Sequence, residues 1–392
     1  MSSALMQNYA RIDIAFEHGE GAYLYADDGR KFLDFASGIG VNSLGHTHPG
    51  VTNALKEQAD KLWHVSNLYN IDMQTRLAER LVANSFADKA FFCNSGAEAV
   101  EATLKMARIY HSTNGNPERY RVITAANAFH GRTLATISAG GQAKHLDGFG
   151  PRVDGFDQIT LNDFDAAKKA IGPETAAILI EPLQGEGGIH TATAEFLTSL
   201  RALADEAGIL LIYDEIQCGM GRTGKLWAHE WSGVTPDIMA IAKALGNGFP
   251  IGAVLATEAV AATLVAGKHG TTFGGNPLAM SVANAVLDEM LADGFLEHVE
   301  RMGALLRERV EALIGNKRVF SEVRGKGLML GLQCTESNLE LMATLREEGL
   351  LSVVADGNAL RLLPPLIINE AQIDEACAAL EHACAVIESS VN

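Results

Sequence analysis

The chain of 392 residues lacks a long apolar run, a surplus of positive charge and a regular cysteine pattern. No apolar run reaches the roughly 18 residues that a membrane-spanning helix requires. The formal net charge is −17, which argues against a nucleic-acid-binding protein, because phosphate contacts need clustered lysine and arginine. The first residues do not combine a charged start, an apolar core and a cleavage site, so we expect no secretory signal.

Cysteine is also scarce: the five cysteines are scattered and odd in number, and no metal-ligand spacing links them. Reduced thiols, and therefore a cytoplasmic protein, are the simplest expectation. Cys218 is interpreted as a packed side chain. With 47% hydrophobic residues, the chain has the composition of a globular enzyme that is large enough for two or three domains.

What is present, from about residue 73 to residue 290, is an alternation of short aliphatic runs with helical stretches. Apolar strands separated by helices predict an α/β fold with a mostly parallel sheet, covered by helices on both faces. Functional residues are then expected in the loops at the strand ends. The predicted strands begin at Lys89, Arg121, Ala176, Ile209 and Ile238.

The two ends of the chain have a different, α+β pattern. Residues 20–35 alternate apolar and polar side chains around Asp28 and Gly29, which predicts a hairpin, and a helix is expected from Pro49 to about Leu62. Towards the other end we predict a helix over 294–314, a strand over 323–332, a helix over 339–348, a strand over 359–363 and a last helix from Glu370. We therefore expect residues 73–290 to form a large domain, and residues 1–72 and 291–392 to form a smaller one together.

Two ionisable residues lie in surroundings that are too apolar for an idle charge. Asp214 ends an aliphatic run, and Lys243 follows the apolar residues 238–242. Pyridoxal phosphate needs both features: the acid pairs with the protonated pyridine nitrogen, and the lysine binds the cofactor covalently. The alternative for Lys243 alone is a side chain that reaches from a buried segment to water.

Two turns after predicted strands could complete such a site. Ser95 precedes a helix in the sequence Asn-Ser-Gly-Ala-Glu, where backbone N–H groups and the helix dipole favour a phosphate. The alternative is an ordinary N-cap with Glu98 completing a capping box, and both can hold. In the second turn, Phe129 could stack on a flat cofactor and Arg132 could bind a carboxylate. The alternative there is a surface turn with a core phenylalanine.

Three further segments leave alternatives open. Glu181 and Glu186 lie in a glycine-rich loop and suggest either general acid/base chemistry or two solvated acids. Residues 219–224 match the dinucleotide fingerprint of an NAD-dependent dehydrogenase, but no clear helix follows and no acid lies at the expected distance. Arg361 lies in an apolar strand and requires a carboxylate partner, which is either a substrate or an acid of the protein.

Two other polar segments are given structural interpretations. His46 and His48 flank a threonine beside glycine and proline, which indicates a turn more than a metal site, and we predict no bound metal. Residues 324–331 are glycine-rich and cationic, and we interpret them as a tight strand start.

Together these segments resemble the class III aminotransferases, which are fold type I pyridoxal-phosphate enzymes, over about residues 19–366. The resemblance implies a mostly parallel seven-stranded sheet with helices on both faces and a smaller α+β domain. The motifs that carry it occur in family order at residues 94–98, 129–133, 181–188, 213–217, 241–252 and 270–277.

For the cofactor, pyridoxal 5'-phosphate, the resemblance implies that Lys243 holds it and moves the reacting proton, while Asp214 pairs with its pyridine nitrogen. The other implied contacts are those of Phe129 with the ring face, Gln217 with the ring hydroxyl, and Ser95, Gly96, Ala97 and Thr272 with the phosphate. Thr272 would come from a neighbouring subunit, so the implied catalytic unit is a homodimer. Many relatives have threonine at the position of Ala97, so one hydroxyl contact is absent here.

For the substrates, it implies that Arg132 and Thr271 hold a carboxylate end. Arg361 would bind the α-carboxylate of glutamate, and Glu186 would neutralise Arg361 when an ω-amine binds. Many relatives have serine in place of Thr271. The activity implied first is transfer of the δ-amino group of N2-acetyl-L-ornithine to 2-oxoglutarate, a step of arginine biosynthesis that gives N-acetylglutamate semialdehyde and glutamate. The alternative amino donors are succinylornithine, succinyldiaminopimelate, ornithine and 4-aminobutyrate.

Overall fold

The structure is a computed structural model that describes residues 4–314 and 319–391. Within these residues the largest sheet has seven strands, and β12 alone runs antiparallel to its neighbours, β4 and β11. The predicted α/β fold with a mostly parallel sheet is therefore confirmed. In sheet order the strands are β4 (Lys89–Cys93), β12 (Gly252–Ala256), β11 (Ile238–Ile241), β10 (Leu210–Asp214), β7 (Thr175–Ile180), β5 (Arg121–Ala125) and β6 (Phe156–Ile159).

Both faces of this sheet are covered, as the apolar strands predicted. Side chains alternate along a strand, so the buried residues of β7 divide between two layers. Ala177 and Leu179 pack in the cluster that contains α4 (Gly96–Thr113), whereas Ile178 and Ile180 pack in the cluster that contains α8 (Ala194–Ala207). Burial on both faces explains why these strands are continuously apolar.

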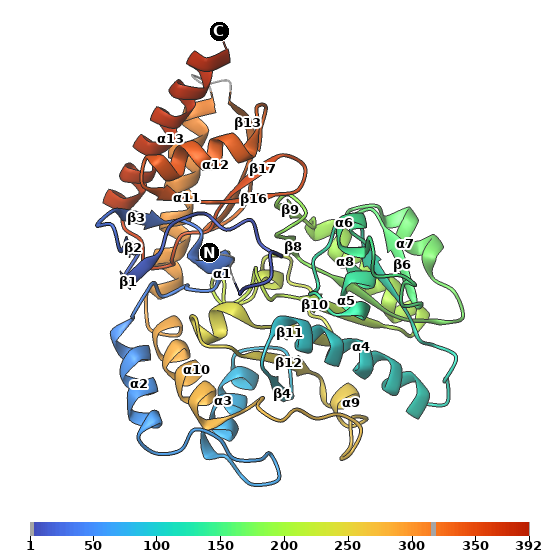
Figure 1. Cartoon of the computed structure of the whole chain (residues 1–392). Helices are drawn as coiled ribbons and strands as arrows, with labels where there is room; N and C mark the ends of the chain where they lie inside the picture. Colours follow the sequence, from blue (N-terminus) through green and yellow to red (C-terminus); the bar gives the residue numbers. More distant parts are fainter. Residues whose placement is uncertain (1–3, 315–318, 392) are drawn as a thin grey trace.

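Figure 1 shows α2, α3 and α10 side by side at one end of the molecule and α4 along the sheet. The helices not yet given bounds are α1 (Ser37–Gly40), α2 (Pro49–Ala59), α3 (Asp72–Ala83), α5 (Leu134–Gly140), α6 (Ala143–Leu146), α7 (Phe164–Ala170), α9 (Glu258–Ala261), α10 (Pro277–Met290), α11 (Phe295–Ile314), α12 (Asn338–Glu347) and α13 (Glu370–Val391), with the 3₁₀ turns η1 (Ala228–Trp231) and η2 (Lys243–Gly246). The predicted helix at Pro49 ends at Ala59, three residues earlier than expected.

The two ends of the chain meet in space. Leu350 of β15 pairs with Leu33 of β3, so the last third of the chain adds a strand to the N-terminal hairpin. Figure 1 places α11, α12 and α13 together beyond the large sheet. The smaller sheets comprise β1 (Phe16–Glu20), β2 (Tyr23–Ala26), β3 (Lys31–Asp34) and β15 (Leu350–Leu351); β13 (Phe320–Lys326), β14 (Met329–Cys334), β17 (Ala359–Leu362) and β16 (Val353–Ala355); and β8 (Leu183–Gln184) with β9 (His190–Thr191). The domain boundaries themselves stay a prediction.

One predicted strand was wrong. Residues 323–332 are not a single strand, because the chain reverses at Gly327 and forms the hairpin β13–β14. Gly327 has φ +56°, and a Cβ there would collide with the backbone of Thr223, so the turn depends on glycine. Arg324 accordingly lies near the end of β13 and does not start a strand.

Candidate active site

Five loops meet at the edge of the sheet where the parallel strands end. They follow β4, β5, β7, β10 and β11, and they surround a cavity of about 390 Å³. Loops at this edge are the usual ligand sites of open α/β sheets. Of the residues predicted from the sequence, those that line the cavity are Ser95, Gly96, Ala97, Phe129, Arg132, Asp214, Gln217 and Lys243.

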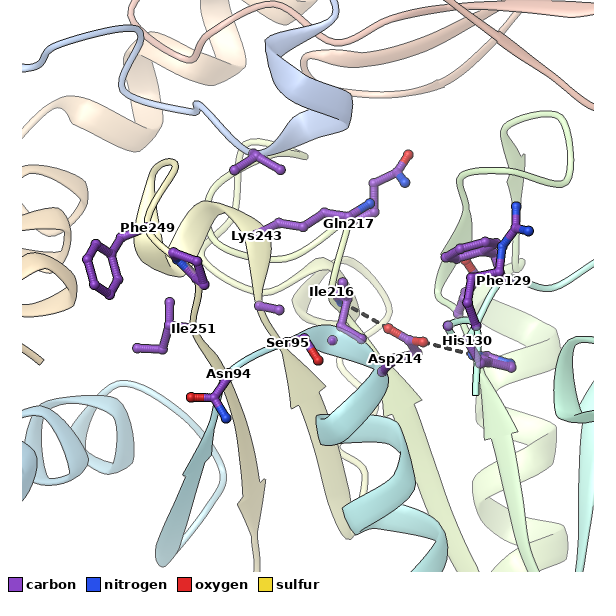
Figure 2. Close-up of a pocket in the computed structure, with 18 of the residues that line it drawn as sticks. Asn94, Ser95, Phe129, His130, Asp214, Ile216, Gln217, Lys243, Phe249 and Ile251 are labelled. Atoms are coloured by element: carbon purple, nitrogen blue, oxygen red, sulfur yellow. Dashed lines mark hydrogen bonds and ion pairs between the residues drawn. The ribbon is translucent and has the colours of Figure 1, made fainter. Parts of the chain in front are cut away.

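Asp214 is the buried acid at the end of β10. One carboxylate oxygen accepts a hydrogen bond from the N–H of Ile216 at 3.0 Å, and the other lies 2.8 Å from Nδ1 of His130. Figure 2 shows both interactions at the floor of the cavity. Burial alone would lower the pKa of His130, but the hydrogen bond and the charge of Asp214 outweigh burial and raise this pKa. The imidazole therefore supports a negative charge on Asp214.

Lys243 begins the 3₁₀ turn after β11, the strand next to β10. Its φ of +45° is rare for a residue with a side chain, and such strain is typical of functional positions. Figure 2 shows its side chain extended across the cavity. Burial lowers the pKa of Lys243 to about 8, and the positive charge of Arg361 also lowers it. A neutral amine, the nucleophilic form, is therefore accessible near neutral pH.

The N-terminus of α4 opens onto the same cavity. Ser95 is its N-cap, and its hydroxyl accepts a hydrogen bond from the N–H of Glu98 at 3.2 Å. The Glu98 carboxylate reaches back to the N–H of Asn94 at 2.6 Å, so the return bond of the predicted capping box ends one residue earlier. The N–H groups of Gly96 and Ala97 have no acceptor within the helix, and they face a cavity that suits an anion.

Gly131 brings the aromatic turn close to this helix end. Its φ is +125°, and a Cβ there would lie 2.7 Å from the Cβ of Ala97. Phe129 and Arg132 on either side line the cavity, and the guanidinium carbon of Arg132 lies 5.5 Å from the centre of the Phe129 ring. The turn therefore presents a flat ring and an exposed cation side by side.

The partner of Arg361 is an acid of the protein, Glu186. It is buried in β17, and its Nη1 donates to Glu186 at 2.8 Å and to the amide oxygen of Gln217 at 3.2 Å. Its Nη2 donates to the carbonyl of Val354. Glu186 keeps about a quarter of its side-chain surface exposed, so the pair lies at the border of the site.

Glu181 and His130 were missed as site residues. The interpretation of Glu181 and Glu186 as two solvated acids is wrong for Glu181, which is buried and lines the cavity. The two acids also have separate partners, because Glu186 binds Arg361 whereas Glu181 accepts from backbone N–H groups. Glu181 directly follows the apolar strand β7, and this position is the signal that could have identified it. His130 lies five residues after β5, and the sequence gives no comparable signal for it.

Thr271 and Thr272 do not line the cavity of their own chain. Thr271 accepts a hydrogen bond from the side-chain amide of Asn94 at 3.2 Å, and Thr272 is exposed. The structure thus brings most of the predicted cofactor residues together, and it leaves Thr271 half-buried and Thr272 exposed outside the cavity.

The segment 219–224 does not form a dinucleotide site. Arg222 is buried there and donates to the hydroxyl of Ser43 and to the carbonyl of Leu328. The residues that follow form turns and then η1, not the helix that a pyrophosphate site requires.

At His46, Nε2 lies 2.8 Å from a carboxylate oxygen of Asp34.

Two general properties concern the described part of the chain only. No helix in it combines the length and the apolar character that a membrane span requires. Within the same residues, no group of three or more His, Cys, Asp or Glu side chains is arranged to hold a metal ion.

Taken together, the cavity can hold a flat, anionic, carbonyl-bearing cofactor. The end of α4 offers an anion site, Phe129 a ring wall, Asp214 a partner for a ring nitrogen and Lys243 an amine that can bond to a carbonyl carbon.

Comparisons with known proteins agree with this arrangement. The family model for aminotransferase class III matches residues 4–384. Acetylornithine aminotransferase from Mesorhizobium japonicum is 60% identical over 95% of this chain and 94% of its own length. N-acetylornithine aminotransferase from Stenotrophomonas maltophilia has a similar structure, with a TM-score of 0.85 and 39% identity over 97% of this chain and 98% of that chain.

A second solved structure extends the likeness. Ornithine aminotransferase from Toxoplasma gondii, in a structure with partial occupancy of PLP at the active site, has a TM-score of 0.95 and 32% identity. The match covers 99% of this chain and 93% of that chain.

Proposed function

The chain belongs to the class III aminotransferases, which are pyridoxal-phosphate enzymes, and we propose that it transfers the δ-amino group of N2-acetyl-L-ornithine to 2-oxoglutarate. The products are N-acetylglutamate semialdehyde and glutamate, and the reaction is a step of arginine biosynthesis. The NAD-dependent dehydrogenase alternative is wrong. The cytoplasmic location predicted from the sequence stays part of this proposal.

The observation that carries the chemistry is that Lys243 and Asp214 face one cavity from neighbouring strands. Two features of the structure fit this cofactor. The N–H groups of Gly96 and Ala97 are open towards the cavity, and glycine at position 131 leaves room beside them. We assign the phosphate to Ser95, Gly96 and Ala97. We assign the ring face to Phe129, the ring nitrogen to Asp214 and the ring hydroxyl to Gln217.

When bound, the cofactor supplies an electron sink that stabilises negative charge at the substrate carbon that carries the amine. Asp214 keeps its negative charge through the hydrogen bonds from Ile216 and His130, and this charge favours a protonated ring nitrogen. Lys243, as the neutral amine, takes the proton from the substrate carbon and returns it. Phe129 holds the reacting plane and limits access of water from one side.

Substrate choice rests on the arginines. Arg132 is exposed and lines the cavity, and it would bind the carboxylate at the far end of each substrate. Arg361, paired with Glu186, is neutralised for the amino donor, which brings no carboxylate to that position. Glutamate would displace Glu186 and bind Arg361, so one pocket accepts two substrates without being rebuilt.

A homodimer is part of the proposal because the loop with Thr271 and Thr272 carries an apolar surface. We call the segments 62–69 and 271–273 the apolar loop pair. They touch through the rings of His64 and Phe273, whose centroids lie 5.2 Å apart. The exposed fractions of its large side chains run from 48% to 89%, for Leu62, Trp63, Leu68, Tyr69 and Phe273. An exposed apolar cluster of this kind fits a subunit interface, and it would deliver Thr271 and Thr272 to the partner's site.

The test of the substrate is a comparison of kcat/KM with 2-oxoglutarate as acceptor for acetylornithine, succinylornithine, succinyldiaminopimelate, ornithine and 4-aminobutyrate. Acetylornithine is expected among the best donors. Ornithine is the second candidate, because the solved structure with a TM-score of 0.95 is an ornithine aminotransferase. Poor turnover of acetylornithine relative to ornithine would contradict the first choice and leave the reaction class intact.

A further inference from the structure

Glu181 is a buried acid that the proposed chemistry does not use. It follows β7 directly, lines the cavity and is only 5% exposed. No salt bridge joins it to a lysine or arginine anywhere in the described residues. A carboxylate is expensive to bury without a cationic partner, so its position calls for an explanation.

The contacts of Glu181 connect two loops of the site. One oxygen accepts a hydrogen bond from the N–H of Phe129 at 3.2 Å, across 52 residues of sequence, and the other accepts from the N–H of Gly185 at 3.5 Å. The first loop carries Phe129 and Arg132, and the second carries Glu186. The other side-chain bond between these loops is neutral, from Gln184 to the carbonyl of Ala126 at 3.1 Å.

We propose that Glu181 is a positioning residue: its buried carboxylate holds the loop of Phe129 against the loop of Gly185 and keeps a negative charge beside Asp214 and His130. The two loops that recognise the cofactor ring and the substrate are thereby fixed relative to each other. Hydrogen bonds from backbone N–H groups to a charged acceptor are stronger than neutral ones, which suits a joint that must hold while Glu186 moves.

Electrostatics set the pH range of this role. Burial raises the pKa of Glu181 to about 7, the charge of His130 works against this rise and the charge of Asp214 adds to it, so the carboxylate carries most of its charge above pH 7. In the other direction, the charge of Glu181 raises the pKa of His130 and of Lys243. The titratable groups that face Glu181 are therefore His130, Asp214, Cys218 and Lys243. Removal of its charge should lower the pKa of Lys243.

The test uses Glu181→Gln, which keeps the shape but replaces one acceptor by a donor and removes the charge. Glu181→Asp keeps the charge with a shorter reach. Glu174→Gln is the matched control, because Glu174 is an exposed acid at the opposite end of β7. Two quantities are measured on each apoenzyme: the Kd for pyridoxal 5'-phosphate, and the pH midpoint for reaction of Lys243 with an amine-selective reagent.

We expect Glu181→Gln to weaken the binding of pyridoxal 5'-phosphate roughly 10-fold, as for a lost charged hydrogen bond. Its Lys243 midpoint should move to lower pH. Glu181→Asp should weaken binding less and keep the midpoint, and Glu174→Gln should match the wild type in both. Wild-type affinity in Glu181→Gln, or weaker binding with an unmoved midpoint, would overturn the inference.

If Glu181→Gln does not fold, Glu181→Asp decides, because wild-type affinity in that variant would also overturn the inference. The inference rests on the proposed cofactor, and the two can fail separately. A wild-type protein that binds no pyridoxal 5'-phosphate would contradict the proposed function. Equal binding by the wild type and by Glu181→Gln would contradict only the role of Glu181.

Discussion

Single residues set the charge pattern of the cavity. Lys243 has a lowered pKa because it is buried, and the N–H of Ile216 and Nδ1 of His130 both face the carboxylate of Asp214. These two residues could be predicted from the sequence, because an ionisable side chain beside an apolar strand is visible there. The partners of these residues could not be predicted from the sequence. His130 and Asp214 lie 84 residues apart, and no local pattern links them.

The pKa of Lys243 predicts how the apoenzyme takes up its cofactor. Only the neutral amine attacks the cofactor carbonyl, so with a pKa of about 8 the uptake rate should rise with pH and level off above that value. Between about pH 7 and pH 9 the rise should be about 10-fold, whereas an ordinary lysine would give about 100-fold without a plateau. Stopped-flow absorbance after mixing measures the rate, and a rise without a plateau would contradict the lowered pKa.

Substitution of Arg132 and of Arg361 should affect the two half-reactions differently. Arg361→Ala removes the site for the glutamate α-carboxylate and should lower kcat/KM for glutamate roughly 100-fold, or about 3 kcal/mol, with a much smaller effect on the amino donor. Arg132→Ala should reduce both half-reactions. Single-turnover kinetics of each half-reaction measures the difference. Equal losses in Arg361→Ala for both substrates would refute the exchange between Glu186 and glutamate.

At the scale of elements, the site depends on where strands end and on how closely the following loops approach. The five predicted strands β4, β5, β7, β10 and β11 were confirmed, because each is a largely apolar run, and β7, β10 and β11 are buried throughout. Two strands of the large sheet were missed. β6 is an edge strand with the polar sequence Phe-Asp-Gln-Ile, and β12 starts at a glycine directly after the lysine segment. In the hairpin β13–β14, Arg324, Gly325 and Lys326 precede the reversal at Gly327, and an apolar run follows it.

A substitution at Gly131 tests how closely the aromatic turn packs against the start of α4. Gly131→Ala combines a strained φ of +125° with a contact of 2.7 Å to Ala97. Strain of about 1–3 kcal/mol should displace the turn and weaken pyridoxal 5'-phosphate binding about 10-fold or more. Gly148→Ala is the control, because Gly148 also has a positive φ, +79°, with no neighbour within 4 Å of an added Cβ. Equal effects of both variants on the Kd would show that the contact with Ala97 is unimportant.

At the scale of the whole molecule, two residues of the proposed site lie outside the cavity of their own chain. Thr271 is half-buried and Thr272 is exposed, and both belong to the apolar loop pair, whose large side chains are exposed. The sequence predicted a shared site only through resemblance to a family, because surface residues have no pattern that names their partner. The domain boundaries are a similar case: the pairing of β15 with β3 joins the chain ends, but where one domain stops depends on packing across many elements.

The proposed dimer predicts a specific effect of charge on the apolar loop pair. Leu68 is 89% exposed in the single chain. Leu68→Glu should bury a carboxylate without a partner at the interface and weaken dimerisation by at least about 100-fold. Sedimentation velocity measures the dissociation constant. Leu339→Glu, at a leucine of α12 that is 59% exposed, should leave the dimer unchanged. A wild-type protein that sediments as a monomer would contradict the shared site.

The most direct measurement is the identification of the residue that binds the cofactor. The purified protein, incubated with pyridoxal 5'-phosphate and reduced with borohydride, should carry one covalent pyridoxyl group on the peptide that contains Lys243, as peptide mass spectrometry shows. Its visible absorption band should disappear on reduction, and Lys243→Ala should have neither the band nor the adduct. A band and an adduct that persist in Lys243→Ala, or a wild-type protein without them, would contradict the assignment of Lys243 and Asp214 to one cofactor site.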